Sequence, residues 1–94
     1  MEISAVIPVY NSEDSLIELC ERLQTVLLEI SERSEIILVN DGSKDSSGEI
    51  IDKLGKEFEW VKGIHLMRNY GQHNALLCGI RNAKYHLIVT LDDD

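Results

Sequence analysis

The chain has 94 residues, a hydrophobic fraction of 44% and a formal net charge of −8. This length suits one small domain, and the negative charge argues against nucleic acid or an anionic membrane as a partner, since both need a basic face. No apolar run approaches the roughly 20 residues of a membrane span, and residues 1–4 lack the basic start of a secretory leader. Cys20 and Cys78 lack metal-site spacing, so we expect two buried thiols in the cytoplasm.

The pattern of apolar residues predicts strand, helix, strand, helix, strand, helix and strand in that order. The predicted strands lie at residues 3–9, 35–40, 61–66 and 87–91, and the helical apolar stripes lie at residues 16–30, 50–58 and 75–83. Asn11 or Ser12 is expected to cap the first helix, and Ser46 with Glu49 has the spacing of a capping box before the second. The alternation predicts an α/β fold with a Rossmann-like parallel sheet of order 3-2-1-4 and helices on both faces.

The last predicted strand is a short apolar run that we expect to be buried, and it leads into Asp92, Asp93 and Asp94. Three adjacent carboxylates repel one another unless a cation lies among them. Side chains alternate along a strand, so Asp92 and Asp94 point the same way and offer two acids to one divalent cation. The alternative is a solvated acidic segment without a ligand.

Polar residues also follow the first two strands. Tyr10 follows the first and Asp41 the second, and on a 3-2-1-4 sheet both would lie near Asp92, because ligands bind outside the carboxyl ends of parallel strands. An aromatic ring, a carboxylate and a metal site together suit a nucleotide. Neither G-x-G-x-x-G nor G-x-x-x-x-G-K-[ST] occurs, so we expect phosphate to bind through metal.

Four blocks of the sequence carry a resemblance to a known family. Residues 5–11 (AVIPVYN), 39–47 (VNDGSKDSS), 68–75 (RNYGQHNA) and 90–94 (TLDDD) resemble, in this order, the family 2 glycosyltransferases of the GT-A fold. The third block is most similar to the subgroup that moves a sugar from a nucleotide donor to a polyprenyl phosphate. The resemblance implies that residues 1–94 are the N-terminal nucleotide-sugar-binding part of such a domain, truncated at the D-x-D motif.

The resemblance also implies roles for individual residues. The nucleotide-binding set would be Pro8, Tyr10, Asp41, Asn69, Gly71 and Asp92, and the metal-binding pair, for Mg²⁺ or Mn²⁺, would be Asp92 and Asp94. Asp41 would contact the base or ribose of a UDP-type nucleotide, with a turn-forming role before Gly42 as the alternative. For Asn69 and Gly71, the alternative is that they only shape their loop. Asp93 departs from the family, where a small residue is common at this position.

The reaction implied is a metal-assisted, inverting transfer from a UDP-sugar to a polyprenyl phosphate or a cell-envelope glycan. The family's catalytic base and the subgroup's membrane helices would lie beyond residue 94, so we expect no catalytic residue here and no turnover by this segment alone. The full-length protein would act at the cytoplasmic face of the membrane.

Two other classes of function compete with this hypothesis. A receiver domain, which accepts phosphate on an aspartate, needs acids after the first and third strands, where this chain has Tyr10-Asn11 and Arg68-Asn69. A non-catalytic domain that self-associates is the other candidate, because an exposed edge at residues 87–91 would be a template for a homodimer.

Overall fold

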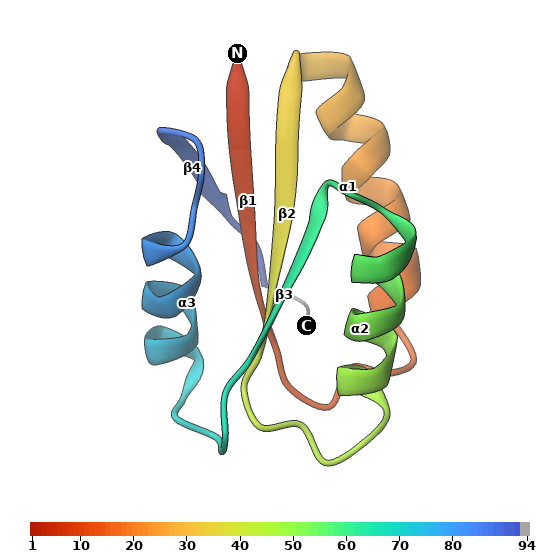
Figure 1. Ribbon diagram of the computed structural model, residues 1–94, viewed down its shortest axis with the longest axis vertical. Coiled ribbons are helices and arrows are strands. Elements are labelled where there is room, and N and C mark those ends of the chain that lie inside the picture. The colour runs from red at the N-terminus through yellow and green to blue at the C-terminus, as the bar shows by residue number, and fades with distance from the viewer. Residues whose placement is uncertain (93–94) are drawn as a thin grey trace.

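Strands and helices alternate along the whole of residues 1–92, which are the residues that the computed structural model describes (Figure 1). The elements are β1 Glu2–Val9, α1 Leu16–Ile30, β2 Arg33–Asn40, α2 Ser47–Glu57, β3 Val61–His65, α3 Gln72–Arg81 and β4 Leu87–Thr90. All neighbouring strands run parallel, and their order is β3-β2-β1-β4. The predicted α/β fold class and strand order are therefore confirmed.

The central strands β1 and β2 are buried on both faces. They pair in register from Glu2 with Arg33 to Val9 with Asn40. α1 and α2 cover one face of the sheet and α3 covers the other (Figure 1). Strands covered on both sides must be apolar at nearly every position, which explains the almost continuous apolar runs in the sequence.

The backbone of α3 packs closely on the sheet. Ala75 and Gly79, four residues apart, are the two buried residues of this helix. A Cβ atom at Gly79 would overlap Cγ1 of Val6 and lie 3.0 Å from Cγ2 of Val39. The close approach of this helix to the sheet therefore depends on a small residue at position 79.

β4 corrects one prediction, because it is an exposed edge strand and not a buried one. Leu87 is 46% exposed and Val89 is 39% exposed. Through the register they share a face with Ile3 and Ala5, the face covered by α1 and α2, but the main contacts of these helices with the sheet are to β2 and β3. Within residues 1–92 no strand pairs with the outer edge of β4, so a homodimer through this edge stays a prediction.

The helices also begin differently from expectation. α1 begins at Leu16, and the backbone carbonyl of Ser12 accepts the N–H groups of Ser15 and Leu16, both at 3.1 Å. Neither the N-cap of α1 nor that of α2, Ser46, makes a side-chain cap hydrogen bond, so both predicted caps were wrong. Asn11 instead accepts the N–H of Lys44 in the opposite turn, and the hydroxyl of Ser12 donates to the carbonyl of Tyr10 in its own turn.

Two smaller expectations have mixed outcomes. Cys20 is buried as predicted, whereas Cys78 is partly exposed on α3. Among residues 1–92, no helix combines the length and the apolar character needed to cross a lipid bilayer.

Candidate functional site

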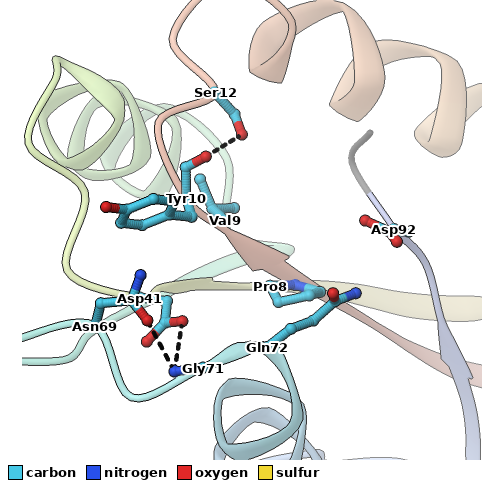
Figure 2. Close-up of a pocket in the computed structure, with 9 residues that line it drawn as sticks. All are labelled: Pro8, Val9, Tyr10, Ser12, Asp41, Asn69, Gly71, Gln72 and Asp92. Atoms are coloured by element: carbon cyan, nitrogen blue, oxygen red, sulfur yellow. Dashed lines mark hydrogen bonds between the residues drawn. The ribbon is translucent and has the colours of Figure 1, made fainter.

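A pocket of about 340 Å³ opens at the carboxyl ends of β1, β2 and β4 (Figure 2). Its lining comes from four separate parts of the chain: Pro8, Val9, Tyr10, Ser12, Asp41, Asn69, Gly71, Gln72 and Asp92. All six residues that the sequence predicted for nucleotide binding are in this set. The volume is within the range of about 300–1,000 Å³ found for small-molecule sites.

Pro8 helps to open this pocket. β1 and β4 are paired up to Val6 and Thr90, and the carbonyl of Val6 accepts the N–H of Leu91 at 3.0 Å. Pro8 is the next β1 residue whose backbone faces β4, and it has no N–H to continue the ladder. The chain after β4 therefore leaves β1, and Asp92 lies across the pocket from Asp41, with Pro8 between them (Figure 2).

Asp41 ties the loop after β3 to the end of β2. Asp41 is only 3% exposed, and its two carboxylate oxygens accept the N–H of Tyr70 at 2.8 Å and the N–H of Gly71 at 3.1 Å. Gly71 shares its N–H with Oδ1 of Asn69 at 2.9 Å. A carboxylate has about four acceptor positions, so Asp41 can hold this loop and still accept a bond from a ligand. This structural role differs from the turn-forming role before Gly42 that was the alternative for Asp41, because its bonds reach a loop about 30 residues away.

Asn11 joins the turn after β1 to the turn after β2. Its N–H donates to Oγ of Ser43 at 3.0 Å, and its Oδ1 accepts the N–H of Lys44 at 2.8 Å. Its φ of 51° lies in the left-handed region, which asparagine tolerates better than most residues. Sequence reasoning missed this role, although asparagine after a strand was a signal for such a turn.

A second group of bonds joins the same two turns. Asp45 accepts the N–H of Glu13 at 3.1 Å and the N–H of Ser47 at 2.9 Å. In return Glu13 accepts the N–H of Ser46 at 3.1 Å, and Oγ of Ser47 accepts the N–H of Ser12 at 2.8 Å. These side chains replace the caps predicted from sequence, and together they fix the two turns that carry Tyr10, Ser12 and Asp41 into the pocket.

Asp45 should make the stability of the chain sensitive to acid. Partial burial pushes the pKa of Asp45 upward, but hydrogen bonds from the side chain and N–H of Ser47 and from the N–H of Glu13 outweigh this, so its pKa lies below 3.8. A lowered folded-state pKa contributes stability above the unfolded value, and this is lost as the pH falls through the folded value. We expect Asp45→Asn to destabilise the chain at pH 7 and to have a smaller effect below pH 3, measured by urea denaturation. An equal effect at both pH values would contradict this role.

The acids of the pocket suit a divalent cation in their chemistry. Asp92 is exposed and lines the pocket, whereas Asp94 lies outside the described residues. Within residues 1–92 no three His, Cys, Asp or Glu side chains gather closely enough to hold a metal by themselves. Mg²⁺ and Mn²⁺ are hard cations, and Mg²⁺ commonly takes only one or two carboxylates and completes its shell with substrate phosphates and water. The predicted pair Asp92 and Asp94 stays a prediction.

Comparison with known proteins gives consistent matches. The model of the family described as "Glycosyl transferase family 2" matches residues 4–94. The undecaprenyl-phosphate 4-deoxy-4-formamido-L-arabinose transferase of Salmonella choleraesuis (strain SC-B67) is 45% identical in an alignment 94 residues long, which covers 99% of this chain and 29% of that protein. The protein of the same name from Pseudomonas aeruginosa (strain LESB58) is 44% identical over 93 residues, 98% of this chain and 27% of that protein.

Solved structures match over the whole chain as well. The crystal structure of S. aureus TarS 1-349 superposes with a TM-score of 0.80 and 25% identity, over 100% of this chain and 28% of that one. The structure of the same protein in complex with UDP gives a TM-score of 0.79 at the same identity and coverage. The chain therefore spans less than a third of the length of these relatives.

Proposed function

The chain belongs to glycosyl transferase family 2, and from this premise we propose that its pocket binds the nucleotide of a nucleotide-sugar donor, with UDP as the nucleotide. The parallel sheet of order 3-2-1-4 matches the N-terminal, Rossmann-like half of the GT-A fold. The observation that carries the proposal is the convergence of six predicted residues, from four separate sequence blocks, on one pocket. The UDP and UDP-GlcNAc complexes of the structurally similar TarS support the choice of nucleotide.

The lining divides into a base side and a phosphate side. Tyr10 and Asn69 lie beside Asp41 at one end of the pocket, where an aromatic ring can stack on a base and polar side chains can bond its edge (Figure 2). Asp92 lies at the other end, toward which the diphosphate would extend. A divalent cation held by Asp92, together with Asp94, would act there as a Lewis acid that stabilises the leaving nucleoside diphosphate.

The proposal extends to the longer protein that the relatives imply. Residues 1–94 would be its nucleotide-sugar-binding part, and the acceptor would be a polyprenyl phosphate or a cell-envelope glycan at the cytoplasmic face of the membrane. The names of the Salmonella and Pseudomonas relatives, which are undecaprenyl-phosphate transferases, support the lipid phosphate. Transfer would invert the sugar linkage, and the base that activates the acceptor would come from outside this chain, which alone would not turn over.

Calorimetric titration of the chain with UDP tests the proposal. We expect saturable binding in the presence of Mn²⁺ and weaker binding after chelation, because the cation offsets the repulsion between the diphosphate and the acidic rim. Asp92→Asn should remove most of this dependence on Mn²⁺. Asp14→Asn removes the same charge from an exposed residue outside the pocket lining, and it should leave the dependence of UDP binding on Mn²⁺ unchanged. Absence of UDP binding at millimolar concentration, with Mn²⁺ present, would overturn the proposal.

A further inference from the structure

Three consecutive hydrogen bonds link α2, through the ends of β3 and β2, to the turn that carries Asp41. Asp52 of α2 lies 2.7 Å from Nε2 of His65, and Nδ1 of His65 lies 3.1 Å from Nδ2 of Asn40. Oδ1 of Asn40 lies 2.9 Å from the N–H of Ser43. None of Asp52, His65, Asn40 and Ser43 lines the pocket.

The two ends of this series of hydrogen bonds fix the direction of every bond in it. The carboxylate of Asp52 can only accept, so Nε2 of His65 carries a proton and donates. The backbone N–H of Ser43 can only donate, so the oxygen of the Asn40 amide faces it and the NH₂ group faces His65. Nδ1 of His65 must then accept, which makes His65 neutral with its single proton on Nε2. Any other tautomer or amide orientation puts two donors against each other.

The side-chain amide of Asn40 is tightly enclosed. Asn40 is 7% exposed and pairs with His65 across the parallel strands. A Cβ atom on Gly48, in the first turn of α2, would lie 3.0 Å from Nδ2 of Asn40. The amide is therefore confined between the sheet and α2, and a buried amide that loses its partners costs free energy.

We propose that Asn40 and His65 are positioning residues, which hold the 41–43 turn in the conformation that binds the nucleotide. The inference rests on the proposed function and deepens it. Ser43, held by Asn40, accepts the N–H of Asn11 through Oγ, so the series of hydrogen bonds reaches both turns that supply pocket residues. Asp41 directly follows Asn40 and is the first residue of this turn, so a change at Asn40 would shift the carboxylate of Asp41 without any contact between Asn40 and the ligand.

Three variants test these hydrogen bonds. Binding of UDP in the presence of Mn²⁺ is one measurement, and nitrogen-15 NMR of the protein is a second that needs no ligand. Asn40→Leu removes both amide bonds, and His65→Phe keeps a ring at the exposed edge but removes both nitrogens. We expect each to weaken UDP binding about fivefold, the effect of one net hydrogen bond, and to speed hydrogen exchange of the Ser43 amide. His86→Phe makes the same change at an exposed histidine that takes no part in these three hydrogen bonds, and it should alter neither UDP binding nor the exchange of the Ser43 amide.

The third variant, Asn40→Asp, is a rescue that a merely structural role does not predict. Its carboxylate can still accept from Ser43, and it can accept from His65 only if Nδ1 gains a proton. We expect UDP affinity within about twofold of the original chain and a doubly protonated His65, because two carboxylates would then flank the ring. Combining Asn40→Asp with His65→Phe should remove the rescue.

The outcomes separate this inference from the proposed function. If the unchanged chain fails to bind UDP, the proposed function is wrong. Hydrogen exchange of the Ser43 amide then tests the inference by itself, and faster exchange in Asn40→Leu and His65→Phe supports positioning of the turn. Unchanged exchange in both variants overturns the inference. So does a proton on Nδ1 of His65 in the unchanged chain, or faster Ser43 exchange that leaves UDP affinity intact.

Discussion

Replacing Asp41 by alanine is expected to abolish measurable UDP binding and to cost the chain about 3 kcal/mol of unfolding free energy. The buried carboxylate accepts two backbone N–H groups, from Tyr70 and Gly71, and hydrogen bonds to a charged group are each worth about 1.5–3 kcal/mol. Since small domains are stable by only about 5–15 kcal/mol, this loss is large. Urea denaturation and calorimetry with UDP measure the two effects.

The conservative variant Asp41→Asn separates the two roles of this side chain. Tyr70 and Gly71 bond different oxygens of Asp41, and asparagine replaces one of these with an NH₂ group that cannot accept, so in the observed geometry only one of the two N–H groups keeps its acceptor. We expect hydrogen exchange at the amides of these two residues to be faster than in the original chain and slower than in Asp41→Ala. Asp14→Ala, at an exposed position, is the control for loss of an aspartate. Full amide protection in Asp41→Ala would show that the loop after β3 does not depend on this carboxylate.

The pocket was predictable because it follows from topology. Once the long apolar runs of β1 and β2 are assigned as central strands, a parallel sheet of order 3-2-1-4 brings the residues after β1, β2 and β4 to one edge. Tyr10 and Asp41 directly follow β1 and β2, and Asp92 comes two residues after the end of β4, so their convergence needs no knowledge of side-chain contacts.

The contacts between the turns were not predictable from local patterns. Asn11, Glu13 and Asp45 belong to residue types that cap helices, and a cap satisfies donors within three residues along the chain. Here each of them bonds an N–H group more than 30 residues away, which only the completed sheet brings within reach, and only Asp45 also keeps a local bond, to the N–H of Ser47. The exposure of β4 escaped prediction for a similar reason, since an apolar run does not reveal which strands the helices cover.

Gly42→Ala is expected to be strongly destabilising, by about 2–5 kcal/mol. Gly42 has a φ of 72°, where an L-residue costs about 1–2 kcal/mol. A Cβ atom there would overlap the carbonyl carbon of Arg68 and the nitrogen of Asn69, and overpacking adds about 1–3 kcal/mol. These are backbone atoms, so the contact cannot be relieved by rotating a side chain. The loop after β3 must move instead, and with it the bonds from Tyr70 and Gly71 to Asp41, so UDP binding should weaken as well.

Gly55→Ala is the matched control, because it makes the same chemical change with the opposite expected sign. Gly55 lies within α2, and a Cβ atom there would meet only the carbonyl oxygen of Val61, at an ordinary 3.9 Å. Replacing a helical glycine by alanine is worth about 0.5–1 kcal/mol of added stability. Urea denaturation of both variants measures the contrast. If Gly42→Ala were as stable as the original chain, the close approach of the 41–43 turn to the loop would not be what holds the base side of the pocket together.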